Sequence, residues 1–262
     1  MIGLTISGAD DDVDPRQLVD IWRSDPWVEF GILVSSSRQG SARYPSRAWR
    51  DRLVSEAPPG MRLSMHLCGA VASDVVRALP GGPISRWLPP EPSRFQRVQL
   101  NGYFKHAADS RIGSCPEEVI ANLRTQSIAC MPPFDWIIQA TSPTELRPAL
   151  ADANAIGNAC VLLDASGGRG TADGFQEWFS DAEAFCRGPR VGFAGGIDLR
   201  NIRRVLDQVH GRSGWFAREA TRGWWIDLES GARDADDRFC LATVREIVSV
   251  AGSWRSENLR SA

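Results

Sequence analysis

Lysine is almost missing from this sequence of 262 residues, in which Lys105 stands alone beside 29 arginines. A reaction that passes through a lysine Schiff base must therefore use Lys105. Basic residues are not in excess either, because 30 Lys and Arg face 32 Asp and Glu, which gives a net charge of -2. Nucleic-acid binding usually needs a basic excess, so we expect no nucleic-acid partner.

Long apolar runs are also absent. No stretch approaches the roughly 20 apolar residues that span a bilayer, and segment 1–14 is acidic at residues 10–12 without a basic flank. We therefore expect neither a membrane association nor a signal peptide. The six cysteines contain no Cys-x-x-Cys pair, and no histidine cluster has metal-ligand spacing. This usage predicts a cytoplasmic protein with reduced cysteines, no metal and no other cofactor, while the oligomeric state is left open.

The sequence does contain a regular alternation of short apolar runs and longer helical patterns. Its composition, with 43% hydrophobic and 24% charged residues, is that of a globular protein. We expect strands at residues 2–7, 28–35, 62–68, 95–101, 135–141, 159–164, 190–194 and 224–228. We expect helices at residues 14–22, 46–55, 70–79, 116–126, 142–155, 175–186, 198–209 and 236–250.

These elements form eight strand–helix units in order, with no linker-like segment between them. Strict alternation predicts parallel strands joined by right-handed crossovers. Eight units within about 250 residues favour a closed barrel over an open sheet. We therefore expect an α/β fold, a single (β/α)8 TIM barrel over residues 1–262, with loops at 80–92 and 104–113 and a frayed tail at 254–262.

Polar side chains gather on one face of the expected strands, towards their C-terminal ends. Because side chains alternate between the two faces of a strand, one face carries Thr5, Ser7, Ser64, His66, Cys68, Gln99, Asn101, Gln139, Thr141, Asp164, Asp227 and Glu229. Burying polar groups costs free energy unless they are hydrogen-bonded, and barrels of this type carry their active sites at this end. The pattern favours a binding or catalytic mouth over a purely structural polar layer.

Glycine-rich turns follow the last three expected strands, at residues 166–170, 194–196 and 230–231. Loops after strands seven and eight often form a phosphate site in such barrels, because glycine lets backbone N–H groups approach an anion closely. We therefore predict a phosphorylated small-molecule substrate. Its phosphate group is expected to contact Gly168, Gly195, Gly196, Ser230 and Gly231.

Taken in order, these segments resemble the phosphoribosylanthranilate isomerase family, the barrel enzymes of tryptophan biosynthesis. The resemblance runs through most of the chain and rests on Asp164 with the glycines after it, Ala194-Gly195-Gly196, Asp227-Leu228-Glu229-Ser230-Gly231, Gln99-Leu100-Asn101-Gly102 and Arg43-Tyr44. Two positions depart from the family. Ile6-Ser7-Gly8 replaces the family's Ile-Cys-Gly turn, and Asn101 stands where the family usually has histidine.

The resemblance implies an isomerase that converts a phosphorylated N-ribosyl substrate from aldose to ketose by an Amadori rearrangement with acid/base catalysis. It implies Asp164 as the acid and position 7 as the base, although Ser7 is a weak base without an activating neighbour. His66 and Cys68, on the inner face of strand three, are further catalytic candidates. The expected substrate-binding residues are Arg43, Gln99, Asn101 and Asp227.

Two other functions fit the same residues. The loss of the strand-one cysteine is compatible with a noncatalytic sugar-phosphate-binding barrel. A lyase or aldolase acting on a sugar phosphate is the other option, and its Schiff base would have to form at Lys105, in the expected loop beyond strand four.

Overall fold

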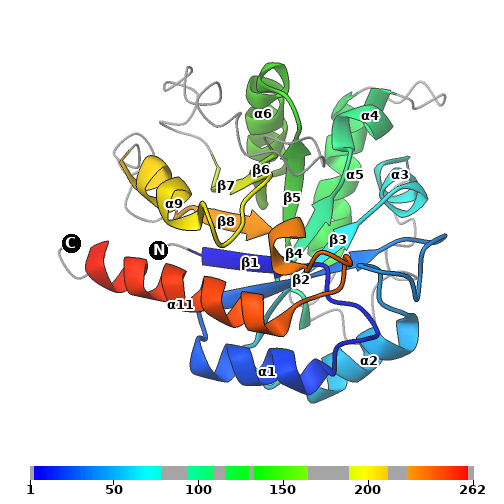
Figure 1. Ribbon diagram of the computed structural model, residues 1–262. Coiled ribbons are helices and arrows are strands. Elements are labelled where there is room, and N and C mark those ends of the chain that lie inside the picture. The colour runs from blue at the N-terminus through cyan, green and yellow to red at the C-terminus, as the bar shows by residue number, and fades with distance from the viewer. Residues whose placement is uncertain are drawn as a thin grey trace.

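The computed structural model describes residues 3–77, 94–108, 116–129, 133–164, 189–211 and 223–258. Within these ranges the strands form a closed barrel, in which each strand pairs with its neighbour in sequence and β8 pairs with β1 (Figure 1). The pairings are parallel throughout. The strands are β1 (Gly3–Ser7), β2 (Val28–Val34), β3 (Arg62–Leu67), β4 (Arg97–Leu100), β5 (Asp135–Ala140), β6 (Ala159–Asp164), β7 (Val191–Ala194) and β8 (Trp225–Leu228). The predicted (β/α)8 barrel is thereby confirmed.

Helices surround the strands on the outside of the barrel (Figure 1). They are α1 (Pro15–Ser24), α2 (Arg47–Glu56), α3 (Ala70–Arg77), α4 (Tyr103–Ala108), α5 (Pro116–Ala129), α6 (Leu146–Ile156), α9 (Ile202–His210) and α11 (Leu241–Asn258), with 3-10 turns η3 (Pro143–Glu145) and η4 (Ser230–Ala232). Local signals start the first two helices. Asp14 and Gln17 form a reciprocal capping box ahead of α1, and the Ser46 hydroxyl accepts from the backbone N–H of Trp49.

The two faces of the strands are buried in different surroundings, as the alternation predicts. The apolar face of β3, with Leu63, Met65 and Leu67, joins the large core between strands and helices. Inside the barrel a small separate apolar cluster is formed by Ile137, Cys160, Leu162 and Trp225. The remaining interior positions are largely polar. Polar side chains that already form hydrogen bonds or ion pairs with each other are not available to a ligand, so a binding site needs polar groups that are not paired in this way.

The N-terminal part of the interior is closed by a buried ion pair. The Arg97 guanidinium donates to both carboxylate oxygens of Glu29 and to the Thr5 hydroxyl at 2.9 Å, and it lies over the Trp225 ring at 4.3 Å. Burial raises the pKa of Glu29, but the Arg97 charge outweighs it and holds that pKa below its usual range. The two charges are thus paired within the barrel floor, and Arg97 Nη1 is left without a hydrogen-bond partner among the described residues.

Three stretches differ from the sequence predictions. Tyr103–Ala108 forms α4 where a loop was expected from residue 104, because Tyr103 buries its ring and donates to Asp152 Oδ2 at 3.1 Å. The helix expected from residue 198 begins at Ile202, after Asn201. The last helix begins at Leu241 rather than at 236, because the Asp234 carboxylate accepts the backbone N–H groups of residues 236 and 238 and holds a turn there.

The last helix also extends to Asn258, into the stretch for which we expected a frayed tail. Trp254 anchors it: this side chain is fully buried, and its indole N–H donates to Asp207 Oδ1 at 2.7 Å. Several expectations fall outside the described residues, namely the helix at 175–186, the glycine turn at 166–170 with Gly168, the loop at 80–92 and the end of the one at 104–113. Among the described residues, none of the helices has the length and apolarity to cross a bilayer.

Candidate active site

A cavity of about 130 Å³ opens at the C-terminal ends of the strands. Its lining includes ten of the predicted catalytic, substrate-binding and phosphate-binding residues: Arg43, His66, Gln99, Asn101, Asp164, Gly195, Gly196, Asp227, Ser230 and Gly231. These residues are contributed by six strands or the loops that follow them, so the barrel brings together side chains that lie far apart in sequence. A larger groove of about 1010 Å³ between α1 and α11 contains none of them.

Asp164 ends β6 and is held by a side chain from the neighbouring strand. Gln139 on β5 donates from Nε2 to Asp164 Oδ2 at 2.9 Å, and its Oε1 accepts the backbone N–H of Gly102 at 3.1 Å. Gln139 thus fixes the direction of the carboxyl group. Strand alternation had already placed Gln139 on the inner face, but its contact with Asp164 depends on the pairing of β5 with β6.

The glycine bends after β7 and β8 pack directly on each other. A Cβ atom added to Gly231 would lie 2.1 Å from the carbonyl oxygen of Ile197, so only glycine allows this approach. Gly195 and Gly196 adopt φ values of 105° and 59°. The Asn201 side chain supports the bend by donating to the Gly196 carbonyl oxygen at 2.7 Å. The two predicted phosphate turns therefore form one continuous wall.

Some backbone N–H groups of this wall have no acceptor among the described residues. Within the described ranges, the N–H groups of Gly196, Ser230 and Gly231 donate no hydrogen bond to the protein. A second cavity, of about 520 Å³, shares these three residues and lies against the same bends. Backbone N–H groups are the donors that bind anions in glycine-rich turns, so the wall has the chemistry of an anion site.

Ser7 and His66 meet in the interior beside a glycine. A Cβ atom added to Gly31 on β2 would lie 2.3 Å from Ser7 Oγ and 2.7 Å from the His66 ring, so these side chains occupy the space that Gly31 leaves. Ser7 is 1% exposed and donates to Asp227 Oδ1 at 3.1 Å. Ser7 therefore lies beneath the cavity and contacts it through Asp227, instead of lining it.

The two candidates on strand three differ in their surroundings. His66 is buried, its Nε2 lies 3.1 Å from Ser64 Oγ, and burial lowers its pKa to about 3, so the ring is neutral at neutral pH. Cys68 follows β3, and burial raises the pKa of its thiol to about 12. The Asn101 amide donates to Cys68 Sγ at 3.1 Å and accepts from Gln99 Nε2 at 2.6 Å. Cys68 thus contacts the cavity lining through Asn101.

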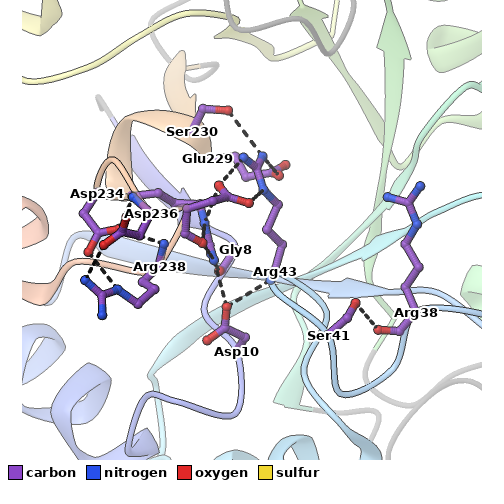
Figure 2. Close-up of polar contacts among 12 residues, drawn as sticks. Gly8, Asp10, Arg38, Ser41, Arg43, Glu229, Ser230, Asp234, Asp236 and Arg238 are labelled. Carbon is purple, nitrogen blue, oxygen red and sulfur yellow. Dashed lines mark hydrogen bonds and ion pairs between the residues drawn. The ribbon is translucent and has the colours of Figure 1, made fainter.

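Arg43 is enclosed by carboxylates at the rim of the cavity (Figure 2). Its guanidinium donates to Glu229 Oε1 at 2.7 Å, to Asp237 Oδ1 at 2.6 Å and to Asp237 Oδ2 at 3.2 Å. Its backbone N–H donates to Asp10 Oδ2 at 3.0 Å. Hydrogen bonds that Arg43 donates to Asp237 and Glu229 raise its pKa further above the usual range.

This network also includes Arg233, which donates to Asp10 Oδ2 at 2.9 Å and to the carbonyl oxygen of Gly8. Asp10, Arg233 and Asp237 were not predicted as site residues, because nothing in the local sequence indicates pairing between loops after β1, β2 and β8. Arg43 is the only arginine or lysine among the described residues that line the cavity. Its charge is balanced by Glu229 and Asp237, so among the described residues the backbone N–H groups of the bends are the donors left for an anion.

Lys105 lies on α4, exposed, and is not among the described residues that line the cavity. The described residues contain no group of three or more His, Cys, Asp or Glu side chains arranged to hold a metal ion. The described residues that line the cavity present carboxyl groups, amides, the His66 ring, the Arg43 guanidinium and backbone N–H groups.

No protein-family model matches the sequence, and no curated protein matches it. Solved structures do match the fold. Phosphoribosyl anthranilate isomerase from Thermotoga maritima superposes with a TM-score of 0.60 at 16% identity, over 97% of this chain and 100% of that one. The enzyme from Thermus thermophilus gives a TM-score of 0.58 at 19% identity, with 97% and 100% of the two chains covered.

A further structure is phosphoribosyl anthranilate isomerase in complex with reduced 1-(o-carboxyphenylamino)-1-deoxyribulose 5-phosphate. It matches with a TM-score of 0.59 at 15% identity, over 97% of this chain and 100% of that chain. At such low identity the likeness concerns the fold alone. The chain thus has a fold like that of phosphoribosyl anthranilate isomerase.

Proposed function

We propose that this chain is an isomerase of the phosphoribosylanthranilate isomerase type, acting in the cytoplasm on a phosphorylated N-ribosyl substrate. The observation that carries the proposal is one cavity that joins a positioned carboxyl group, Asp164, to the paired glycine bends at 195–196 and 230–231. An acid and an anion site in one cavity are what an aldose–ketose isomerisation of a sugar phosphate requires.

In this proposal the substrate phosphate binds the backbone N–H groups of the bends, which places the ribose over the barrel mouth. Asp164 protonates the furanose ring oxygen, and the ring opens to an iminium ion. A base then removes the proton at C2, and the resulting enolamine collapses to the ketone. Gln99 and Asn101 line the same cavity and serve as amide contacts for the sugar.

The bound ligand of one structural neighbour, a ribulose 5-phosphate that carries a carboxyphenylamino group, agrees with this chemistry. Phosphoribosylanthranilate is therefore the first substrate to test. The full chain should restore growth without tryptophan to an auxotroph that lacks this isomerase. Asp164→Asn should abolish growth, while Asp152→Asn, on α6 outside the cavity, should retain it. No growth with well-expressed wild-type protein would rule out this reaction.

A noncatalytic sugar-phosphate-binding barrel is the second candidate, favoured by Ser7 in place of a cysteine. Inorganic phosphate binding to the purified chain separates the two functions. If Asp164→Asn binds phosphate as wild type does but loses turnover, the enzyme is supported. If wild type binds phosphate and turns over none of the substrate, the binding protein is supported.

A further inference from the structure

The proposed reaction needs a base for the C2 proton, and position 7 holds only a hydroxyl. A serine hydroxyl is a weak base unless a neighbour activates it. In this chain the neighbour is a carboxyl group, because Ser7 Oγ donates to Asp227 Oδ1 at 3.1 Å. The hydrogen bond runs from Ser7 to the carboxyl group, so the acceptor is Asp227.

One carboxyl oxygen of Asp227 is available to a ligand. Its side chain is 6% exposed and lines the cavity, and its Oδ2 atom has no hydrogen-bond partner among the described residues. His66 Nε2 lies 3.9 Å from Oδ2, which is beyond hydrogen-bond distance. A buried polar oxygen without a partner costs free energy. A substrate hydrogen or hydroxyl in the cavity would supply the missing contact.

The groups around Asp227 come from several strands. The titratable or hydrogen-bonding groups that influence its carboxyl group are Ser7 on β1, Glu29 on β2, His66 on β3, Arg97 on β4 and Glu229 after β8. Burial raises the pKa of Asp227 to about 8, with Arg97 and Ser7 lowering it and the two glutamates raising it. A base whose pKa lies near the working pH is the most efficient one.

The other candidates for the base are occupied or unsuitable. His66 has a pKa lowered to about 3, and its Nε2 is within hydrogen-bond distance of Ser64. The Cys68 thiol, with a pKa of about 12, stays protonated. Glu229 accepts from Arg43 at 2.7 Å. Among these groups, only Asp227 combines a place in the cavity lining with an unpartnered oxygen.

We propose that Asp227 is the general base of this enzyme, with Ser7 as the residue that positions it. The proposal rests on the proposed function. Asp227 Oδ2 takes the proton from C2 of the iminium ion, the C2–H electron pair forms the C1=C2 bond, and the C=N electron pair moves to nitrogen. The same proton returns to C1 during ketonisation, and the C2 hydroxyl proton restores Asp164. The sequence of steps consumes no co-reactant.

Steady-state kinetics of the purified full chain with phosphoribosylanthranilate tests the assignment. Asp227→Asn should lower kcat by about 10²–10⁴-fold with KM nearly unchanged, because a base acts in the transition state. Asp227→Glu should recover part of this loss. Asp152→Asn is the control and should leave kcat unchanged. Circular dichroism of each variant checks that it is folded.

The pH profile separates a base from a merely structural carboxyl group. Wild-type kcat/KM should rise with pH to a plateau, with a midpoint near 8. Ser7→Ala should move this midpoint to higher pH, because the lost hydrogen bond favoured the carboxylate.

If wild type is active and Asp227→Asn stays within threefold of its kcat, the assignment is overturned while the proposed function stands. If the midpoint of the kcat/KM profile is the same in Ser7→Ala as in wild type, Ser7 is not the residue that positions Asp227. If folded wild type shows no turnover at all, the proposed function fails, and this assignment fails with it.

Discussion

At the scale of single residues, the interior of the barrel is organised around the space left by one glycine. Gly31 lets Ser7 and His66 enter the barrel from strands β1 and β3, on either side of β2. The Ser7 hydroxyl that fills this space donates to Asp227 Oδ1. The surroundings of the candidate base thus depend on a residue that has no side chain.

Gly31→Ala should therefore disturb both stability and the site. Its new Cβ would lie 2.3 Å from Ser7 Oγ, so Ser7 or the strand must shift. We expect a loss of about 1–3 kcal/mol in the free energy of unfolding, measured in urea. Gly252→Ala is the matched control, because the nearest atom to its Cβ lies 3.6 Å away, on the Trp27 ring. Placed within helix α11, that alanine should stabilise the protein by about 0.5–1 kcal/mol. Equal stabilities for Gly31→Ala and wild type would contradict the packing described here.

The same scale shows what sequence can and cannot predict. Strand alternation sorted Met65 from His66 and Leu163 from Asp164 correctly, because a parallel barrel leaves each strand only two faces. It did not predict that Arg43 is paired. Its partners Glu229 and Asp237 lie 186 and 194 positions away in the chain, and only the folded barrel brings their loops together.

At the scale of elements, hydrogen bonds and ion pairs connect the loop between β2 and α2 to the loop between β8 and α11. Arg43 is the connecting residue, and it adopts a φ of 73°, a left-handed conformation that costs free energy in a residue other than glycine. The hydrogen bonds to Asp10, Glu229 and Asp237 hold it there. The last helix starts at Leu241, later than helical patterning predicts, because Asp234 holds a turn before it and Asp237 pairs with Arg43.

Two substitutions distinguish the contribution of the Arg43 side chain to stability from that of its backbone conformation. Arg43→Ala loses the ion pairs and keeps the strained φ, whereas Arg43→Gly loses the ion pairs and relieves the strain. We expect Arg43→Gly to be the more stable variant by about 1 kcal/mol. Both should speed amide hydrogen exchange at Gly40 and Tyr44, whose N–H groups donate within this loop. Arg52→Ala, which removes a surface pairing with Asp14 and Glu56, should leave those two amides unchanged. Identical exchange in all three variants would show that the loop is held by other contacts.

At the scale of the whole molecule, two buried groups make stability depend on pH in opposite directions. The His66 pKa is lowered from 6.5 to about 3, so the unfolded chain binds more protons between these values and stability rises with pH there. The Asp227 pKa is raised from 3.8 to about 8, so the folded chain binds more protons over that window and stability falls as pH rises. Between pH 3.8 and pH 6.5, where the two windows overlap, the two slopes largely offset each other.

Between pH 6.5 and pH 8 only the Asp227 slope remains of these two. At up to about 1.4 kcal/mol per pH unit, it amounts to about 2 kcal/mol of lost stability. Asp227→Asn cannot ionise, so its unfolding free energy should exceed that of wild type at pH 8 and converge with it near pH 4. Urea unfolding of both proteins across this range measures the difference. If the unfolding free energies of the two proteins change in parallel with pH, Asp227 is already ionised in the folded protein over this range. A curve that diverges as expected would show that burial of Asp227 raises its pKa at a cost in stability, as is common at functional sites, and the pH profile of kcat/KM then distinguishes a base from a structural carboxyl group.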